Sequence, residues 1–163
     1  EHISIRIFQL IYSEKDFAGY YKFAFVRNPW DKLVSAYTFL KAGGANEKDK
    51  QWAKKNLADY EDFDCFVSKW VNAHNIYTYE HFIPQHEFVC IKGARPAMDF
   101  IGHFENFQQD FNVAQSRLGI KNTLQHLNLS KRRNYKDYYT EKTKRIVANV
   151  YETDIRLFGY SFD

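Results

Sequence analysis

Short apolar runs and longer helical stripes alternate along this chain. The runs KFAFV (22–26), FVCI (88–91) and DFIGHF (99–104) are rich in residues that favour strands, and each predicts a short strand. The first run indicates a buried strand, because the residues after its lysine are all apolar. Asn28-Pro29 ends it, since proline cannot extend a strand ladder but suits the first turn of a helix.

Much of the remaining sequence carries apolar side chains three or four positions apart, which is typical of helices with one buried face. Asn106, with Gln109 at the capping-box position, is predicted to cap its helix. The charged stretch 45–60 is predicted to be a helical excursion or a mobile insert. The helices are predicted over 3–12, from Pro29 to Gly43-Gly44, over 63–71, from Asn106 to Gly119, and from Thr140 to Gly159.

Strands that alternate with helices predict an α/β domain with a mostly parallel sheet. A length of 163 residues fits one domain, so residues 1–163 are interpreted as a single unit. The chain begins at Glu1 with no initiator methionine, and we expect it to be an N-terminally truncated piece of a longer protein. The pattern does not specify an oligomeric state.

The composition narrows the class of protein. Apolar residues make up 45% of the chain, enough for a core, and no apolar run is long enough to cross a membrane. Cys65 and Cys90 match no metal or redox spacing, so we expect buried free thiols and no metal site. The lack of disulfide-like pairing favours a cytoplasmic location over the Golgi lumen or a membrane-associated location, which an upstream anchor would imply.

Positive charge is concentrated near the C-terminal end. The net charge of the chain is +3, but residues 131–145 alone hold seven basic and two acidic side chains, a balance of +5. Binding of a local anion is one interpretation of this segment, and a solvated helix face is the other.

A candidate anion site lies where the strand at 22–26 meets the following helix. Ligands of open α/β sheets bind beyond the carboxyl ends of the strands, and Arg27 lies at such an end. The helix N-terminus adds its dipole and free N–H groups, and Arg27 adds a planar fork that can bind phosphate through two hydrogen bonds. Ser35 shares the polar helix face with Asn28 and Asp31/Lys32 and can donate a further hydrogen bond. The alternative is an Arg27–carboxylate pair that closes the sheet edge, with Ser35 exposed.

The stretch FVRNPWDKLVSAY (25–37) resembles the signature of the sulfotransferases that use 3′-phosphoadenosine 5′-phosphosulfate (PAPS). DFIGHFENFQQDF (99–111) and LNLSKRRNYKDYYTEKTKRIV (127–147) resemble two later segments of that family, and EHISI (1–5) resembles its carbohydrate 2-O-sulfotransferase branch. The resemblance implies a P-loop-NTPase-like three-layer fold. It also implies transfer of a sulfuryl group from PAPS to a hydroxyl of a carbohydrate, with adenosine 3′,5′-bisphosphate (PAP) as product and no metal.

The resemblance also assigns roles to individual residues. Arg27 and Ser35 match the arginine and serine that hold the 3′-phosphate in the family. His2 matches the proposed catalytic base, a role that suits a histidine with a pKa near neutrality. The loop that wraps the cofactor would contain Ser130, Lys131, Arg132 and Arg133.

The sequence departs from the family pattern in three places. The family begins with a strand and a loop rich in Lys, Gly, Ser and Thr that cradles the 5′-phosphosulfate, and this chain contains no such segment before its signature. Lys32 stands where the family often has arginine, and His103 replaces the arginine of the usual IGRFE segment.

His81 and His86 are interpreted as loop residues, with an acceptor-side wall as the alternative.

Two other functions remain open at this point. One is a non-catalytic module that binds a nucleotide or polyanion and retains only the 3′-phosphate pocket. The other is a nucleic-acid binder that uses KRRNYKDYY (131–139), where basic residues are interleaved with aromatic ones. We rank nucleic acid last among the partners, because no known nucleic-acid motif accompanies this short run.

Overall fold

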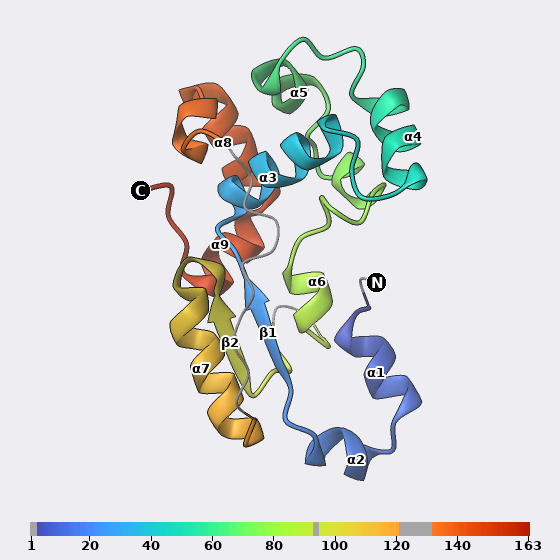
Figure 1. The fold of residues 1–163 in the computed structure, drawn as a ribbon, viewed down its shortest axis with the longest axis vertical. Helices are drawn as coiled ribbons and strands as arrows, with labels where there is room; N and C mark the ends of the chain where they lie inside the picture. The colour runs from blue at the N-terminus through green and yellow to red at the C-terminus, as the bar shows by residue number, and fades with distance from the viewer. Residues whose placement is uncertain (1–2, 93–94, 121–131) are drawn as a thin grey trace.

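The computed structural model describes residues 3–92, 95–120 and 132–163, which form a helix-rich α/β fold (Figure 1). Within this part of the chain, strands β1 (Phe23–Val26) and β2 (Phe100–His103) pair in parallel. The register places Phe23 opposite Phe100 and Val26 opposite His103, so both carboxyl ends lie at the same edge. The predicted parallel sheet is therefore confirmed as a small two-stranded one among the described residues.

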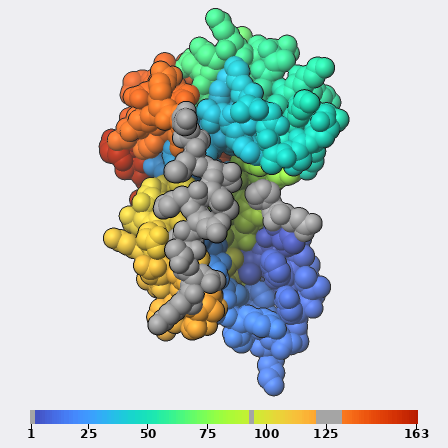
Figure 2. Space-filling view, in the orientation of Figure 1, coloured from blue at the N-terminus to red at the C-terminus, as the bar shows by residue number. Residues whose placement is uncertain are grey.

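Helices make up most of the described chain. Figures 1 and 2 show the N-terminal helices at one end of the molecule, the helices between residues 29 and 69 at the other, and the helix after β2 alongside that strand. Short 3-10 turns are η1 (Asn75–Tyr77), η2 (Phe104–Asn106) and η3 (Tyr135–Tyr138). The helices are α1 (Ile5–Ile11), α2 (Glu14–Gly19), α3 (Pro29–Lys41), α4 (Glu47–Asn56), α5 (Phe63–Lys69), α6 (His86–Val89), α7 (Phe107–Leu118), α8 (Glu141–Val150) and α9 (Glu152–Phe158).

The main hydrophobic core lies around α3, which packs against α5 and α8. Val34 and Leu40 of α3 are fully buried there, as is Phe66 of α5. Aromatic rings fill much of this core, and Phe66 stacks on Trp70 with ring centroids 5.1 Å apart. This packing holds α3 against α5 and α8. A second, smaller core beside β1 consists of Val26, Val89, Cys90 and Phe158.

The strands predicted at 22–26 and 99–104 are confirmed, whereas the one predicted at 88–91 is wrong. Helix α6 contains the first two residues of that run, and Cys90 makes an isolated antiparallel bridge with Pro96. The buried Asp154 carboxylate accepts hydrogen bonds from the backbone N–H groups of Gln85 (2.6 Å) and His86 (2.9 Å), which stabilises the start of α6. A contact with a distant residue therefore overrides the local strand preference.

The helix predicted from Thr140 to Gly159 is interrupted at Tyr151, which separates α8 from α9. Tyr151 has φ −108° and ψ 23°, outside regular helical values. Its buried hydroxyl donates to the carbonyl of Phe82 (2.7 Å). Asn106 stands at the N-cap position of α7, as predicted, but its side chain makes no capping bond with a described residue, and η2 already places it in a helical turn.

The other predicted helices are confirmed, with ends shifted by a few residues. The stretch 45–60 was interpreted as a helical excursion or a mobile insert, and the structure supports the helical excursion, because α4 (Glu47–Asn56) lies within it. The glycines predicted to end helices do so: Gly43, Gly119 and Gly159 all have positive φ, a conformation that glycine adopts without strain. Helix α2 was not predicted.

One edge of β1 carries no strand from the described residues. The carbonyl of Lys22 accepts from Phe100 N–H (3.2 Å), so the main-chain groups of alternate residues from Lys22 onward face β2. Those of Phe23 and Phe25 face the opposite edge, where no described backbone group bonds to them. The strand was predicted to be buried, yet Phe23 is 37% exposed and Val26 alone is fully buried.

The two cysteines are free, as predicted. Cys90 is buried, and burial raises the pKa of its thiol, whereas Cys65 is only half-buried. No helix in the described ranges is both long and apolar enough to cross a bilayer.

Candidate functional site

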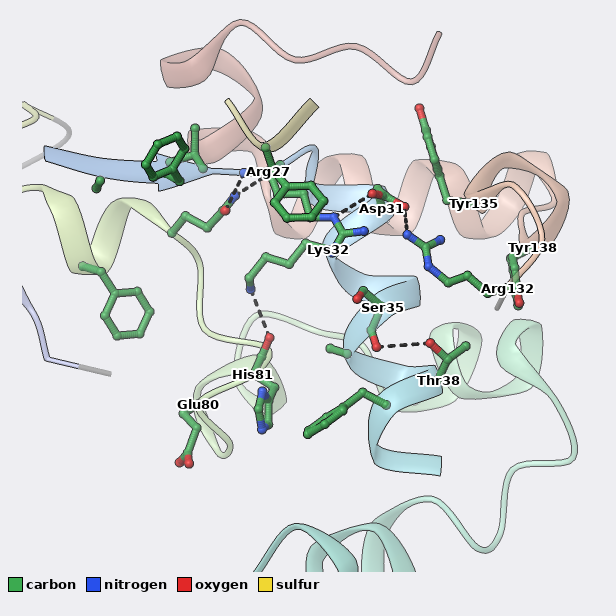
Figure 3. A pocket seen from close by; sticks show the side chains of 18 of the residues that line it. Arg27, Asp31, Lys32, Ser35, Thr38, Glu80, His81, Arg132, Tyr135 and Tyr138 are labelled. Carbon is green, nitrogen blue, oxygen red and sulfur yellow. Dashed lines mark hydrogen bonds and ion pairs between the residues drawn. The ribbon is translucent and has the colours of Figure 1, made fainter. Parts of the chain in front are cut away.

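A cavity of about 1370 Å³ opens beyond the carboxyl end of β1 (Figure 3). Its walls come from the first turns of α3, from the segment around residues 80–85 and from the segment that begins at residue 132. It brings together four of the residues predicted to form the site, from positions up to 106 residues apart, namely Arg27, Ser35, Arg132 and Arg133. The other predicted site residues, His2, Ser130 and Lys131, lie outside the described residues.

Arg27 is held at the sheet end by its backbone and by its side chain. The side-chain amide of Gln85 accepts from Arg27 N–H (2.8 Å) and donates to Arg27 C=O (2.7 Å), as a neighbouring strand would. The guanidinium lies 4.3 Å from the ring centroid of Phe104, and its Nε donates to Asp31 Oδ2 (2.6 Å). Arg27 therefore presents its guanidinium in one defined orientation.

Asp31 connects two of the predicted cofactor-binding arginines. One carboxylate oxygen accepts from Arg27 and the other from Arg132 Nη2, and all three side chains line the cavity (Figure 3). The carboxylate pair considered as an alternative for Arg27 is therefore present, within the wall of the cavity. Sequence reasoning missed Asp31 as a site residue, although its i, i+4 spacing from Arg27 is the signal that identifies such a pair.

Ser35 lies two turns into α3, half-buried, in the wall of the same cavity. Asn28, which was expected to share its polar face, is instead buried and caps the helix by accepting from Trp30 N–H (3.1 Å). The backbone N–H of Asn28 donates to Glu105 Oε1 (2.7 Å). The N–H groups at the start of α3 were expected to be free for an anion. This is wrong for the N–H groups of Asn28 and Trp30, which both have acceptors within the protein.

Lys32, which stands where the family often has arginine, is a structural residue. Its ammonium donates to the carbonyls of His81 (3.1 Å) and Ile83 (2.8 Å), and so ties that segment to α3. Burial lowers the pKa of Lys32 to about 8, and the negative charge of Asp154 opposes this shift only in part. The charge at this position is therefore directed at main-chain oxygens.

The contribution of Lys32 to the free energy of unfolding is expected to become more favourable as the pH rises from 8 to 10. The pKa of Lys32 is about 8 in the folded chain against an ordinary value of 10.5, so the unfolded chain binds more protons in this interval. We expect the free energy of unfolding, relative to that of Lys32→Met, to rise by on the order of 1–2 kcal/mol. Urea unfolding at pH 7.5, 8.5 and 9.5 measures this difference, with exposed Lys142→Met as the control. Parallel curves for wild type and Lys32→Met would contradict it.

The two histidines near the cavity have different roles. His81 lines the cavity, and its Nε2 lies 3.4 Å from Oδ1 of buried Asp49. Although burial works in the other direction, hydrogen bonds from Tyr79, Ala45 and His81 hold the pKa of Asp49 below its usual value. His86 is not among the residues that line the cavity, and its Nδ1 lies 2.6 Å from Asp154 Oδ1. The acceptor-side wall considered for both therefore has geometric support for His81 alone.

The basic segment divides between the cavity and the solvent. The hydroxyls of Tyr135 and Tyr139 donate to the carbonyls of Phe162 (2.8 Å) and Trp30 (2.9 Å), which hold this segment against α3. Arg133 lies 4.6 Å from the ring centroid of Tyr138, also in the cavity wall. Arg145 and Lys142 of α8 are exposed. The solvated helix face is thus confirmed for the α8 part of the segment, while anion binding by the part in the cavity wall stays a prediction.

A second cavity, of about 550 Å³, is lined mainly by apolar residues between positions 3 and 24, together with Phe88, Val89 and Met98. Ile3, Ala24, Phe88 and Val89 line both cavities. Ile3 is the described residue next to His2, and Ser4 Oγ donates to the carbonyl of Glu87 (2.8 Å), so the start of α1 is anchored beside α6. In the described part of the chain, no three His, Cys, Asp or Glu side chains are grouped as metal ligands would be.

Comparison with known proteins identifies the family. Residues 8–161 match the model of the sulfotransferase family, which covers β1, α3, β2 and the basic segment. The chain is also similar to an uncharacterized protein of Archaeoglobus fulgidus, with 29% identity over 111 residues, 68% of this chain and 78% of that protein. No solved structure matches. With a family match over nearly its whole length, and with Arg27, Ser35 and Arg132 in one cavity, the chain belongs to the sulfotransferase family.

Proposed function

We propose that this protein transfers a sulfuryl group from PAPS to a hydroxyl of a carbohydrate and releases PAP. The acceptor oxygen forms a bond to sulfur, the bond between sulfur and the 5′-phosphate oxygen breaks, and His2 takes the hydroxyl proton. The observation that carries the proposal is the convergence of Arg27, Ser35 and Arg132 on one cavity at the end of a parallel strand, in a chain of this family.

The charges in the cavity suit the 3′-phosphate. The residues that line the cavity bring four positive charges (Arg27, Lys32, Arg132 and Arg133) and two negative ones (Asp31 and Glu80), which leaves a positive surplus that favours an anion. Guanidinium groups bind phosphate oxygens through paired, charge-assisted hydrogen bonds, and the Ser35 hydroxyl supplies a neutral donor. Ser130 and Lys131 precede Arg132 directly, and we assign them with Arg132 and Arg133 to the loop that wraps the cofactor.

The unpaired edge of β1 supports the P-loop-like fold implied by the family. The main-chain groups of Phe23 and Phe25 face that edge, and the apolar second cavity lies next to it. Such an edge favours pairing with a further strand, whose following loop would bind the 5′-phosphosulfate. We propose that residues 1–163 belong to one sulfotransferase-like domain.

Titration calorimetry with PAP tests the 3′-phosphate pocket. We expect PAP to bind more tightly than adenosine 5′-monophosphate, because only PAP carries the 3′-phosphate. Ser35→Ala is expected to weaken PAP binding by about 1 kcal/mol, the usual contribution of one hydrogen bond, and to leave binding of the monophosphate unchanged. Equal binding of the two nucleotides by the wild-type protein would contradict the pocket. Binding to random oligonucleotides that falls steeply with salt would instead favour the nucleic-acid alternative.

Replacing His2 by alanine in the full-length protein tests the base. We expect PAPS affinity to be retained and turnover to fall by on the order of a hundredfold or more, because a positioned base contributes about that factor. Sulfate transfer from labelled PAPS to a panel of carbohydrates measures turnover, with His74→Ala as a control outside the cavity. Unchanged turnover would mean that another group is the base. PAP binding without any transfer by the wild-type protein would favour the non-catalytic binding module.

A further inference from the structure

We propose that Asp31 is a positioning residue of the 3′-phosphate pocket, whose carboxylate orients Arg27 and Arg132 together toward the anion. This inference rests on the proposed function, since the anion is the 3′-phosphate of PAPS or PAP. It assigns an acidic residue to a pocket for a highly charged anion. Simple charge repulsion predicts that removing this acidic charge strengthens anion binding, whereas our proposal predicts that it weakens anion binding.

The geometry joins three parts of the chain at one carboxylate. Arg27 ends β1, Asp31 lies in the first turn of α3, and Arg132 follows 101 residues later. The side chain of Asp31 is 15% exposed and that of Arg132 12%, so the contact is largely shielded from solvent. Figure 3 shows Arg132 reaching from its own segment to Asp31, opposite Arg27. Among the described residues, no other hydrogen bond or ion pair orients the Arg132 guanidinium.

Two positive side chains need such a partner to share one pocket. Like charges repel, and each arginine has many rotamers, so two arginines near one site would separate before the anion arrives. A carboxylate between them offsets the repulsion and fixes the orientation of both guanidinium groups at once. Nε of Arg132 is buried with no hydrogen-bond partner among the described residues, which leaves one of its donors available for a ligand oxygen.

Asp31 also lies on a helix that is packed into the main core. It follows Trp30 and precedes Leu33 and Val34, all buried in the main core, so its own position is set by packing. Arg27 is fixed by Gln85 and Phe104 on its other sides. Arg132 has no comparable support within the described contacts, so we expect the loss of the carboxylate to displace Arg132 more than Arg27.

Asp31→Asn tests the proposal, since it removes the charge and keeps the size. We expect PAP affinity to fall by about tenfold or more, although a negative charge has left the pocket, while affinity for adenosine 5′-monophosphate stays unchanged. Asp31→Glu is expected to restore part of the loss. Asp137→Asn, an exposed change of the same kind outside the cavity, is the control and should have no effect. Equal or tighter PAP binding by Asp31→Asn would overturn the proposal.

A double-mutant cycle shows whether Asp31 acts through Arg132. We expect Asp31→Asn to lower the PAP affinity much less when Arg132 is already replaced by methionine. If the losses of PAP affinity from the two substitutions simply add, the proposed coupling is overturned. If Asp31→Asn does not fold, Arg132→Met alone must lower the preference for PAP over the monophosphate, and an unchanged preference would overturn the proposal. A wild-type protein that does not distinguish the two nucleotides would instead overturn the proposed function, and this inference with it.

Discussion

Arg27→Lys is expected to weaken PAP binding by about ten- to a hundredfold, or about 1.4–2.8 kcal/mol, although the side-chain charge is unchanged. An arginine can donate to Asp31 and to a phosphate at the same time, because its donors are spread over a planar fork. The ammonium of lysine is a single compact charge, so it cannot contact Asp31 and the phosphate at the same time in this way. The loss of the flat contact with Phe104 adds to the effect.

Calorimetry with PAP measures this change, and Arg145→Lys is the matched control. Arg145 is exposed on α8 outside the cavity, so its replacement should leave the affinity unaltered. Equal affinity of Arg27→Lys and wild type would argue against a direct phosphate contact. A loss shared by PAP and adenosine 5′-monophosphate would place the contact at some other part of the nucleotide.

Asp154→Ala is expected to lower the free energy of unfolding by about 3–5 kcal/mol, a large fraction of the stability of a typical domain. The fully buried carboxylate accepts from the backbone N–H of Gln85 (2.6 Å) and from both the backbone and the ring of His86 (2.9 and 2.6 Å). Its removal leaves three donors without a partner in the interior. Asp154→Asn keeps one acceptor oxygen and is expected to cost less, about 1–3 kcal/mol.

Urea unfolding followed by tryptophan fluorescence measures both variants, with exposed Asp59→Asn as the control. A loss below 1 kcal/mol for Asp154→Ala would show that water or rearranged side chains replace the carboxylate. The effect should also reach the cavity, because Gln85 holds the backbone of Arg27. We therefore expect folded Asp154→Asn to bind PAP more weakly than wild type does.

The junction of β1 and α3 could be predicted from the sequence because its causes are local. A continuous apolar run favours a strand, Asn28-Pro29 ends it and begins a helix, and the spacing of apolar residues aligns that helix with the core. Those steps alone placed Arg27 at a strand end and Ser35 two turns along the next helix. Both lie in the cavity wall, and the phosphate contact itself stays a prediction.

Errors arose where distant residues decide the local structure. FVCI has the composition of a strand, but Asp154 stabilises a helical turn at its start. The partners of Lys32 are also distant in sequence, since its ammonium donates to the carbonyls of His81 and Ile83, and no signal in the sequence identifies them. The missing side-chain cap at Asn106 has a local cause instead, because the turn directly before it is already helical.

Neighbours within a few positions, or a linear motif, specify the strand–helix junction, the family resemblance and the residues available to bind an anion, so these could be predicted from the sequence. Which of these residues meet depends on the tertiary fold. Asp31 joins Arg132 across 101 residues, and Gln85 bonds to Arg27 across 58. No local preference specifies such contacts, because they form only when the packing of α3 and its neighbours brings their backbones together.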